Sequence, residues 1–562
     1  MKGLVSKMGK AGTVHKGQSP YGALDRRAGT VHKGQSPFLK LAALVCLPLA
    51  VAAQGLDPAA IVKPTPNLWP TYNGDYSGRR FSPLKQINQD NVKNLQLAWL
   101  YHANTGSGGS PFGTEIKSTP LEVDGVLYFT VPDHAWALDA RTGRQIWHYK
   151  WESKGGIHTG NRGVGIYHNW LFFETPDNHL VSLEKDTGKF RWAVEIADLA
   201  QEYFSTPAPL VIGNHVLVGV GGDSLDVPGY LEARDPETGA VQWHWNTEPR
   251  PGEPGSETWP NAQAMTHGGG MTWLTGTYDP ELNLLYWGTG NPNPVHAGQG
   301  RKGDDLWTCS IVALNPDTGK LVWWFQASPH DTHDWDNVEE PVLFDAEING
   351  QKRKLLAQAA RNGYFFVLDR TNGKSVATAP FIDLNWSTGV DSRGEPIPNP
   401  AKEPKTDGAL VIPASGGATN WPPPSFDPET GLFYVSASPS YSVYYLTDTS
   451  EKPEGYGGRD SGVWSKSELV ALDYKTGKIK WKHVFPGDGE SISGILTTAG
   501  KLLFTGDPSA NFIAFNPENG KILWHAGLTS PVSNGPMTYE LDGRQYLVVG
   551  AGDMLYAFIL PR

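Results

Sequence analysis

Cysteine is nearly absent from this sequence, which contains only Cys46 and Cys309. Cys46 lies in a segment that we expect to be removed, so the mature chain has one thiol and cannot form an internal disulfide. Export does not require disulfides, so this scarcity does not argue against it. No Cys-x-x-Cys-His motif occurs, which excludes a c-type haem attached to this chain.

Basic residues are also fewer than acidic ones. Lys and Arg number 47 against 58 Asp and Glu, which gives a net charge of -11. No basic stripe is visible, so nucleic acids and anionic membrane surfaces are not expected as partners. A positively charged protein is compatible with this balance.

No apolar run is long enough to cross a bilayer comfortably. The segment FLKLAALVCLPLAVAAQ, from Phe38, combines a basic residue, a short apolar run and small residues, which is typical of a secretory signal. We expect residues 1–53 to be a leader, with cleavage near Ala52 or Ala53, and the mature protein to be periplasmic without stable membrane insertion. An N-terminal anchor is the alternative. The leader also contains AGTVHKGQSP twice, a duplicated or misassigned start to which we assign no function.

Long helical periodicity is scarce, whereas turn-forming and aromatic residues are frequent. The sequence has 65 Gly, 44 Pro and 21 Trp. This composition indicates a turn-rich, all-β protein.

One pattern recurs through the body of the chain, and each copy predicts a strand, a tight turn and a second strand. Asp or Asn and Gly supply the turn chemistry, and the Gly can adopt a positive φ. The Trp at the end of most copies begins the second strand and can pack flat between sheets. The copies are ALDARTGRQIW ending at Trp147, SLEKDTGKFRW at Trp192, ARDPETGAVQW at Trp243, ALNPDTGKLVW at Trp323, ALDYKTGKIKW at Trp481 and AFNPENGKILW at Trp524, with a weaker copy, VLDRTNGKSV, from Val367.

The spacing of these copies predicts a β-propeller, because units of about 40–50 residues with four short strands are typical of propeller blades. The wider gaps contain diverged hairpins, YDPELNLLYWG and FDPETGLFYVS. We therefore expect an all-β, eight-bladed β-propeller with tryptophan-docking repeats, which forms a single domain over residues 54–562. The repeat tryptophans are expected to pack blades together and to take no part in catalysis.

A propeller with L-D-x-x-T-G-x-x-x-W repeats resembles the quinoprotein alcohol dehydrogenases, the methanol/ethanol dehydrogenase family. The resemblance covers nearly the whole mature chain and implies pyrroloquinoline quinone (PQQ) and a metal ion as cofactors. Non-catalytic propellers of outer-membrane assembly also carry the repeat, so the site motifs must decide the function.

The resemblance implies cofactor contacts in several blades. Arg162, in an Asn-Arg-Gly turn, is similar to the family's cofactor-carboxylate arginine, and its planar fork can bind a carboxylate through two bonds. Trp273 is placed like the tryptophan that stacks under the quinone, where a rigid indole makes a flat floor. The other implied cofactor contacts are Thr206, Gly221, Gly222, Arg361 and Asn420.

The family's metal ligands are only partly matched. Asn291, in GTGNPNP, resembles the amide ligand, whose carbonyl oxygen suits calcium. The family's metal-binding Glu would fall at Ser224, and serine is a poor replacement for a charged oxygen ligand. We expect Asp223 to take this role, with Asp226 as the alternative.

The segment SPHDTHDWDNVEEPV, Ser328–Val342, carries the most reactive side chains, with two histidines and three carboxylates in the seven positions from His330 to Asp336. Like charges crowd there, which is costly unless the carboxylates hold a cation or take a proton. Alignment with the family's motif implies that Asp334 is the catalytic base and a metal ligand. Asp336 shares its face in an extended chain and is expected to bind the metal too. Arg361 would stabilise charge on the quinone oxygens.

The identity of the metal is left open between calcium and a lanthanide. An acid at Asp336 resembles the lanthanide-using branch, whereas calcium enzymes usually carry a small residue there. His330 and His333 could be zinc ligands, but no third nitrogen or sulfur ligand is evident nearby.

The chain also departs from the family in two places. The two adjacent cysteines of many family members fall at Gly156 and Ile157, so their ring-shaped disulfide is absent. Lys117 stands where the family often has a carboxylate, and it could pair with an acidic cofactor or be solvated.

These motifs imply an exported PQQ- and metal-dependent dehydrogenase that oxidises a primary or secondary alcohol to an aldehyde or ketone. Because this chain holds no haem, electrons must leave through a separate acceptor, expected to be a cytochrome c, and a homodimer is compatible with the sequence. Two alternatives stay open: a PQQ-dependent sugar or polyol dehydrogenase, and a non-catalytic propeller that binds other proteins.

Overall fold

The computed structural model describes residues 55–105, 113–157, 160–222, 224–490 and 493–562. Antiparallel sheets dominate these ranges, and none of their helices has the length and apolarity needed to cross a membrane. The helices are α1 (Pro58–Val62) and α2 (Ala262–His267), with 3-10 turns at Val92–Asn94, Leu199–Gln201, Ser256–Thr258, Gly298–Gly300 and Pro400–Lys402. Contacts group the residues from Ala53 to Arg562 into one unit.

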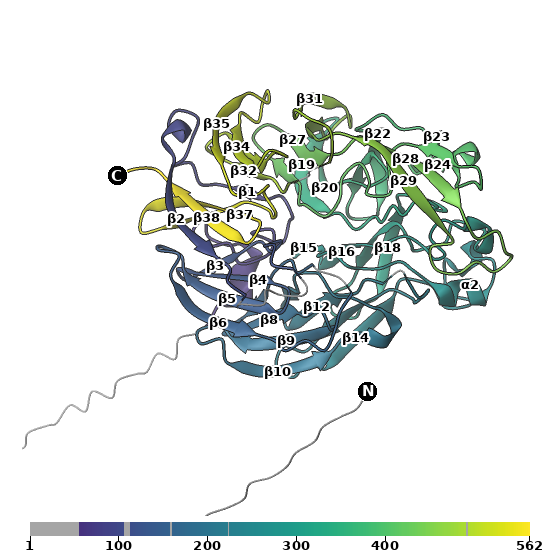
Figure 1. Ribbon diagram of the computed structural model, residues 1–562, viewed down its shortest axis with the longest axis horizontal. Helices are drawn as coiled ribbons and strands as arrows, with labels where there is room; N and C mark the ends of the chain where they lie inside the picture. Colours follow the sequence, from purple (N-terminus) through teal and green to yellow (C-terminus); the bar gives the residue numbers. More distant parts are fainter. Residues whose placement is uncertain (1–54, 106–112, 158–159, 223, 491–492) are drawn as a thin grey trace, which may run out of the picture. The chain divides into compact units, whose positions relative to one another are not determined.

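Eight sheets of four or five strands build most of the described chain, and they follow one another around this unit in sequence order (Figure 1). The strands of the first four sheets are β3 (Leu121–Val123), β4 (Val126–Val131), β5 (His134–Asp139) and β6 (Gln145–Lys150); β7 (Gly165–Tyr167), β8 (Trp170–Glu174), β9 (His179–Glu184) and β10 (Phe190–Glu195); β11 (Leu210–Ile212), β12 (His215–Gly219), β13 (Tyr230–Arg234) and β14 (Val241–Asn246); β15 (Thr277–Asp279), β16 (Leu284–Gly288), β17 (Ser310–Leu314) and β18 (Leu321–Gln326). This is the β-propeller fold that the repeats predict.

The other four sheets include strands from both ends of the described chain. Their strands are β19 (Val342–Ile348), β20 (Gln351–Ala359), β21 (Tyr364–Asp369) and β22 (Lys374–Pro380); β26 (Ser425–Asp427), β27 (Leu432–Ala437), β30 (Glu468–Asp473) and β31 (Ile479–Val484); β1 (Phe81–Ser82), β32 (Leu496–Thr498), β33 (Leu502–Gly506), β34 (Asn511–Phe515) and β35 (Ile522–Gly527); β2 (Gln96–His102), β36 (Met537–Leu541), β37 (Arg544–Ala551) and β38 (Met554–Ile559).

Two smaller sheets interrupt the repeat, and no pattern in the sequence predicts them. Their strands are β23 (Ser387–Val390) and β24 (Pro396–Pro398), and β25 (Ala409–Val411), β28 (Ser440–Leu446) and β29 (Gly458–Ser465). They lie in the insertions between β22 and β26 and between β27 and β30.

The repeat turns form as the sequence predicts. In the first copy, Oδ1 of Asp139 accepts hydrogen bonds from the backbone N–H groups of Arg141 and Thr142, both at 3.0 Å. The N–H of Gly143 then donates to the carbonyl of Asp139 at 2.8 Å, and Gly143 has φ 69°. A residue with a side chain would be strained at this φ, which accounts for the Gly in the pattern. The diverged hairpins also form, as β15–β16 and β26–β27.

Each of several repeat tryptophans contacts the turn of the following sheet. The indole nitrogen of Trp147 donates to the carbonyl of Lys185 at 2.8 Å, and a Cβ added to Gly188 would lie 2.7 Å from its ring. Trp243 and Trp323 make the same kind of contact with Gly319 and Gly373. The glycine therefore also leaves room for the indole of the preceding repeat.

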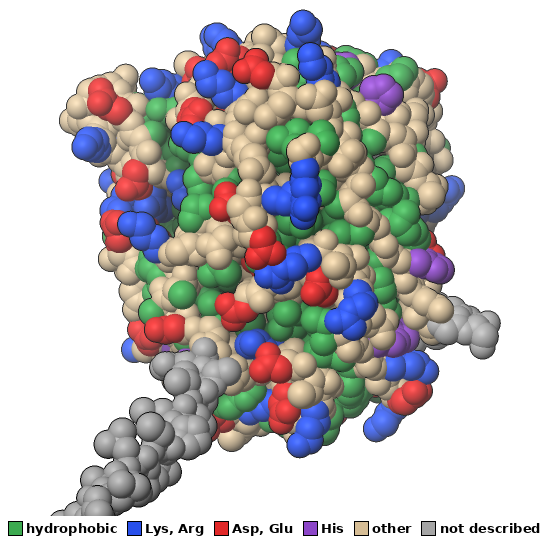
Figure 2. All heavy atoms as spheres, turned by 90° about the vertical axis from the view of Figure 1, so that its left-hand side faces the viewer, with side chains coloured by type: hydrophobic (Ala, Val, Ile, Leu, Met, Phe, Trp, Pro, Cys, Tyr) green, Lys and Arg blue, Asp and Glu red, His purple; other side chains and the backbone are tan. Residues whose placement is uncertain are grey.

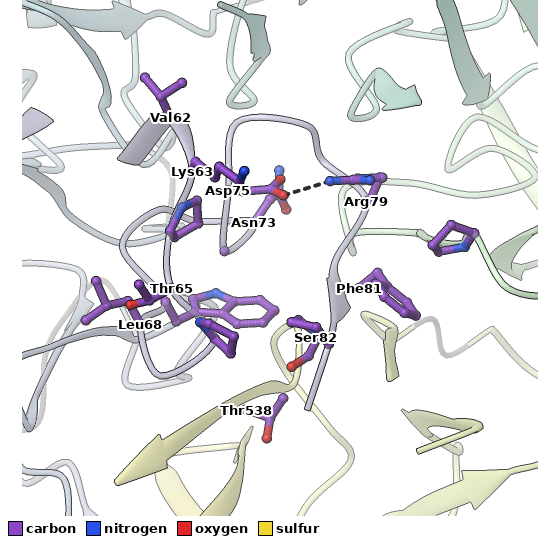
Figure 3. A pocket seen from close by; sticks show the side chains of 16 residues that line it. Val62, Lys63, Thr65, Leu68, Asn73, Asp75, Arg79, Phe81, Ser82 and Thr538 are labelled. Atoms are coloured by element: carbon purple, nitrogen blue, oxygen red, sulfur yellow. Dashed lines mark hydrogen bonds and ion pairs between the residues drawn. The ribbon is translucent and has the colours of Figure 1, made fainter. Parts of the chain in front are cut away.

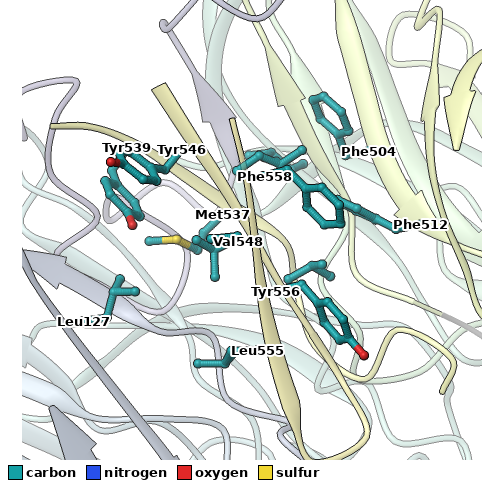
Figure 4. Close-up of a cluster of buried hydrophobic side chains, with 14 of the residues drawn as sticks. Leu127, Phe504, Phe512, Met537, Tyr539, Tyr546, Val548, Leu555, Tyr556 and Phe558 are labelled. Atoms are coloured by element: carbon teal, nitrogen blue, oxygen red, sulfur yellow. The ribbon is translucent and has the colours of Figure 1, made fainter. Parts of the chain in front are cut away.

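The sheet at the C-terminal end is completed by a strand from the N-terminal part of the chain. Strand β2 pairs antiparallel with β38, from Gln96 opposite Ile559 to His102 opposite Met554. A large apolar cluster lies beneath this pairing, and Figure 4 shows Phe504, Phe512 and Phe558 together in it. Joining both ends of the described chain in one sheet removes the edges that an open propeller would expose.

Candidate active site

Four connections between strands carry the candidate site. Trp273 precedes β15, Asn291 follows β16, Asp334 and Asp336 lie between β18 and β19, and Arg361 follows β20. The contacts below show that the structure brings these five predicted residues together.

Asp331 shapes the turn that presents the predicted base. Its Oδ2 accepts hydrogen bonds from the backbone N–H groups of His333 (3.3 Å) and Trp335 (3.1 Å), which flank Asp334. Asp334 has φ 67°, a left-handed conformation that costs energy for a residue with a side chain and persists only when its surroundings fix it. Trp335, only 1% exposed, anchors the turn by donating to the carbonyl of Ala414 at 3.0 Å.

Asp336 is bound to two of the other site residues. Its Oδ2 accepts a hydrogen bond from the indole nitrogen of Trp273 at 2.8 Å. Its Oδ1 accepts one from the backbone N–H of Asn291, also at 2.8 Å. These bonds orient the Asp336 carboxylate and fix the plane of the indole.

The amide of Asn291 faces two carboxylates. One of its two terminal atoms lies 2.8 Å from Oδ1 of Asp336 and 3.2 Å from Oδ1 of Asp334. With the amide nitrogen there, the side chain donates two hydrogen bonds. With the amide oxygen there, three oxygens converge, which is favourable only around a cation. Hard oxygen donors of this kind suit Ca²⁺ and ions of similar size.

The residues present therefore fit part of a metal site. Within the described ranges, no three His, Cys, Asp or Glu side chains gather closely enough to hold a metal ion. The cluster supplies two carboxylates and one amide. Asp223, the third predicted carboxylate, lies outside the described residues.

Arg361 joins the carboxylates from one side. Its Nη1 donates to the backbone carbonyl of Asp334 at 2.8 Å and lies 3.3 Å from Oδ2 of Asp336. It also lies 3.7 Å from Oδ1 of Asp334, and its Nε lies 3.9 Å from Glu339. A planar guanidinium in this position offsets the repulsion between the carboxylates.

Arg162 lies over the same indole as Arg361 does. Its guanidinium carbon is 4.9 Å from the centre of the Trp273 ring and 5.0 Å from that of Trp421. Its backbone N–H and Nη1 both donate to the carbonyl of Thr206, whose hydroxyl donates to the carbonyl of Trp273 at 3.0 Å. Burial lowers the pKa of Arg162 to about 10, so it stays charged at neutral pH.

The surroundings of Arg162 fit a flat ligand that carries carboxylates. Arg162 is 2% exposed, and its Nε has no hydrogen-bond partner among the described residues. A buried guanidinium with an unused donor beside two indole faces matches the ring and the acidic groups of PQQ. The residues present therefore fit this cofactor.

The remaining predicted cofactor residues have contacts of their own. Gly221 pairs with Phe204, and a Cβ there would overlap the Phe204 ring, so a local contact accounts for this glycine. Gly222 has φ 151°. Asn420 accepts from the N–H of Trp421 at 2.8 Å, which places it next to the Arg162 contacts.

The alternative ligand Asp226 is engaged elsewhere. Both oxygens of its carboxylate accept from the N–H of Gly455, at 2.9 and 2.8 Å, and Oδ2 lies 3.4 Å from His267. Lys117 lies 3.6 Å from Glu115, so it has an acidic neighbour within the chain.

The two histidines of the motif do not converge on one point. Nδ1 of His330 lies 2.8 Å from the carbonyl of Gly303, whereas Nε2 of His333 lies 2.9 Å from that of Lys402. His333 also stacks on Trp335 at 4.3 Å, and burial lowers its pKa to about 3. His333 is therefore a neutral packing residue, and the geometry gives no support to zinc.

Sequence reasoning missed Arg301, a fully buried side chain that forms hydrogen bonds to two of the connections that carry the site. Its Nε and Nη2 donate to the carbonyls of Pro294 and Val295, both at 2.9 Å, and Nη2 also donates to the carbonyl of Asp331. Its Nη1 donates to Asp305 at 2.8 Å. The Arg301 side chain thus joins the connection that carries Asn291 to the turn that carries Asp334. The sequence around Arg301 does not predict this role, because the polar segment RKGDD is typical of a solvated loop.

Comparison with known proteins identifies the class of this site. The family model described as "Glucose/ethanol/alcohol dehydrogenase, beta-propeller domain" of PQQ proteins matches residues 69–380 and 483–547. The quinoprotein alcohol dehydrogenase PedH of Pseudomonas putida is 37% identical over 510 residues, which cover 84% of each chain. The 1-butanol dehydrogenase (cytochrome c) of Thauera butanivorans is 34% identical, over 86% of this chain and 74% of that one.

A solved structure agrees with these relatives. A europium-containing methanol dehydrogenase superposes with a TM-score of 0.79 and 29% identity, over 89% of this chain and 99% of that one. The chain belongs to the family of quinoprotein alcohol dehydrogenases, which are PQQ-dependent oxidoreductases.

Proposed function

We propose that this chain is an exported dehydrogenase that uses PQQ and a metal ion to oxidise a primary or secondary alcohol to an aldehyde or ketone. The observation that carries the proposal is the convergence of Asn291, Asp334 and Asp336, with Trp273 bonded to the last of them. A protein scaffold has no need for a repulsive oxygen cluster beside two buried arginines, whereas a redox site of this family does.

Each residue then has a distinct task. Bound PQQ would supply a carbonyl able to accept hydride from an alcohol carbon, and a metal ion held by Asn291, Asp334 and Asp336 would supply Lewis-acid polarisation. Asp334 takes the hydroxyl proton as general base. Arg361 would stabilise negative charge on the quinone oxygens. Trp273 and Arg162 bind and orient the flat cofactor.

Both calcium and a lanthanide fit the proposed metal site. The additional carboxylate of Asp336 favours a trivalent ion, and the europium-containing relative supports this choice. We propose that Asp223 supplies a further ligand and that Gly221, Gly222, Thr206 and Asn420 line the cofactor.

The architecture and the acceptor complete the proposal. We propose that the eight main sheets are eight blades docked by the repeat tryptophans, which the Trp147 and Gly188 contact supports. A separate cytochrome c would take the electrons, as the name of the Thauera relative suggests. The signal-like segment from Phe38 supports a periplasmic location.

The surface charge of the protein indicates which kind of electron acceptor it would bind. The net charge of -11 favours a basic partner. On the face drawn in Figure 2, acidic and basic side chains are interspersed, so that face by itself offers no large field of one sign. A homodimer is compatible with the same surface.

Dye reduction by the full chain tests the proposal. The protein would be stripped of metal, then given PQQ with either calcium or lanthanum and offered ethanol, 2-propanol, glucose and glycerol. Turnover of the alcohols supports the proposal, whereas turnover of glucose or glycerol alone moves it to the sugar and polyol class. PQQ that neither binds nor supports turnover with either ion would leave a non-catalytic propeller.

A further inference from the structure

The two insertions that interrupt the repeat meet in one sheet beside the turn that carries Asp334. The first insertion, residues 381–424, lies between β22 and β26, and the second, residues 438–467, lies between β27 and β30. Strand β25 of the first pairs antiparallel with β28 of the second, and Ala409 lies opposite Tyr444. The eight main sheets include none of these strands, so the propeller itself does not account for the insertions.

Tyr444 contacts the turn from the second insertion. Its side chain is fully buried, and its hydroxyl donates to the backbone carbonyl of His333 at 3.3 Å. Its ring lies edge-on to the His333 imidazole, with 4.9 Å between the ring centres and 83° between the ring planes. The residue that Tyr444 contacts therefore comes directly before the proposed base, Asp334.

The imidazole of His333 makes contacts at both ring nitrogens. Nε2 lies 2.9 Å from the carbonyl of Lys402, and a carbonyl can only accept, so Nε2 carries the proton and donates it. Nδ1 is then an acceptor, and the hydroxyl oxygen of Thr332 lies 3.4 Å from it. Because Lys402 belongs to the first insertion, both insertions hold the same residue.

The residue on the other side of Asp334 also contacts the first insertion. The indole nitrogen of Trp335 donates to the carbonyl of Ala414, and its ring lies 5.0 Å from that of Trp386. Trp335, Trp386 and Tyr444 belong to one buried apolar cluster. Asp334 has φ 67°, and such a backbone conformation persists only when its surroundings fix it. Contacts from the insertions on both flanks provide these surroundings.

The first insertion also holds the segment that carries Arg361. The backbone N–H of Ala418 donates to the carbonyl of Arg361, and the indole nitrogen of Trp386 donates to that of Asn362, both at 2.7 Å. A Cβ added to Gly417 would lie 2.7 Å from Cβ of Arg361, so the two segments are in close contact. The insertions therefore reach the proposed base and the arginine beside it.

Open space borders the turn on one side, so packing does not fix it from there. A cavity of about 400 Å³ is lined by His330 and Thr332 from the motif and by Glu403 and Leu446 from the insertions. The cavity of about 330 Å³ in Figure 3, which Asn73 lines, lies elsewhere, and none of its described lining residues belongs to the motif or the insertions. The insertions therefore supply fixing contacts where the motif borders a cavity.

We propose that the two insertions position the proposed base, with His333 and Tyr444 as positioning residues that act through Asp334. This inference rests on the proposed function, in which Asp334 takes the proton of the alcohol hydroxyl. Holding the His333 carbonyl fixes the peptide plane that leads into Asp334, and with it the direction of the carboxylate. A base must lie within hydrogen-bond reach of the proton that it takes, so a small displacement slows the reaction.

The test uses Tyr444→Phe and His333→Phe in the full chain, loaded with PQQ and with the ion, calcium or lanthanum, that supports turnover. Each variant keeps a buried ring and removes hydrogen bonds at the turn. His333→Gln is the rescue variant, because its amide can still donate to the Lys402 carbonyl. Tyr539→Phe is the matched control, because Tyr539 is also fully buried and donates to the carbonyl of Ala140 at 2.6 Å, within the cluster drawn in Figure 4.

Steady-state alcohol oxidation is the first readout. We expect kcat to fall about tenfold in both phenylalanine variants at the turn, because the base is less often within reach of the proton. His333→Gln should recover part of this loss. KM and PQQ affinity should stay within about twofold of the wild type, since only an interaction that serves the transition state is removed. Tyr539→Phe should change none of these quantities.

Hydrogen exchange of residues 328–342, followed by mass spectrometry, gives a readout that needs no activity. The backbone N–H groups of His333 and Trp335 donate to Oδ2 of Asp331, so a looser turn should exchange them faster. We expect faster exchange in both phenylalanine variants at the turn and unchanged exchange in the control.

The outcomes separate the positioning role from the proposed function. Variants that keep the full kcat, or that leave exchange in residues 328–342 unchanged, overturn the positioning role while the proposed function stands. A merely structural role would lower Tm alike in Tyr444→Phe and Tyr539→Phe and would change KM together with kcat, which also overturns it. A wild type that oxidises no alcohol overturns the proposed function, and the positioning of a base with it, whatever the exchange shows.

Discussion

The indole nitrogen of Trp273 donates to Oδ2 of Asp336 at 2.8 Å, so the flat floor of the site and one of its carboxylates are held by a single bond. Asp336 is 4% exposed, and Trp273 is 8% exposed. A change at Asp336 therefore alters the charge at the metal position and the orientation of the indole at once.

Replacing Asp336 should separate these two effects. We expect Asp336→Ala to weaken Tb³⁺ binding at least tenfold in the presence of PQQ, because a carboxylate near the ion is lost. Asp336→Asn keeps an acceptor for Trp273 and should preserve indole orientation while still losing affinity. Luminescence of bound Tb³⁺, excited through tryptophan, measures both. Equal affinity in all three proteins would exclude Asp336 as a ligand.

Asp334→Asn removes the proposed base with little change in shape. We expect kcat for alcohol oxidation to fall by about 10²–10⁴-fold, the usual contribution of a general base. PQQ binding should persist, since Trp273 and Arg162 are untouched. Asp304→Asn, which changes an exposed carboxylate, is the control. Retention of more than a tenth of the wild-type kcat would show that another group takes the proton.

Arg162→Lys tests the carboxylate contact. Lysine keeps the charge but lacks the planar fork, so we expect PQQ affinity to fall at least tenfold, equal to about 1.4 kcal/mol. Arg191→Lys is a matched control, because Arg191 also lies over an indole, 3.6 Å from the centre of Trp170, and belongs to an outer strand. Quenching of tryptophan fluorescence by PQQ gives the affinities. The same loss in both variants would mean that the effect is not specific to the site.

The buried ion pair of Arg301 and Asp305 should stabilise the fold only while both partners are present. Both side chains are fully buried, with Nη1 2.8 Å from Oδ2. Arg301→Met leaves the buried Asp305 carboxylate with only the Nδ1 of His330, 3.5 Å from its Oδ2, and should cost about 3–5 kcal/mol of unfolding free energy. The double variant Arg301→Met/Asp305→Leu should recover part of this loss. Denaturant unfolding measures the cycle, and strictly additive losses would contradict the account.

Glu122 should make stability fall as pH rises. Burial raises its pKa to about 8, although Gly125 N–H donates to its Oε1 at 2.7 Å. Between about pH 4.5 and pH 8 the folded chain holds a proton that the unfolded chain releases, so the unfolding free energy decreases with pH in this window.

Glu122→Gln should remove that dependence. We expect the variant to exceed the wild type by about 1–3 kcal/mol at pH 9 and to approach it at pH 5. Denaturant midpoints at several pH values give the comparison. A stability difference that is the same at pH 5 and pH 9 would mean that Glu122 is ionised throughout.

The repeat turns could be predicted because their chemistry is local. The Asp139 side chain caps N–H groups two and three residues ahead, and Gly143 supplies the positive φ. Both features are visible within one copy of the pattern. The site positions Trp273, Asn291 and Asp334 were found because the family motifs carry them with little change.

Other features depend on contacts between distant parts of the chain. The pairing of β2 with β38 joins residues more than 450 positions apart, such as Gln96 and Ile559, and no local pattern announces it. Arg301 sits in a polar segment, and only the fold reveals that carbonyls of Pro294, Val295 and Asp331 surround it. The two small sheets, one of β23 and β24 and the other of β25, β28 and β29, lie in insertions that lack the repeat.

A crystal structure of the full chain with PQQ and lanthanum would show directly whether Asn291, Asp334 and Asp336 hold the metal. We expect one strong metal peak within about 2.3–2.6 Å of oxygens from Asn291, Asp334 and Asp336, the range usual for ions of this size. The quinone should lie against Trp273, with a carboxylate at Arg162. A metal peak remote from Asn291 and Asp334, or PQQ away from Trp273, would contradict the assignment of this site.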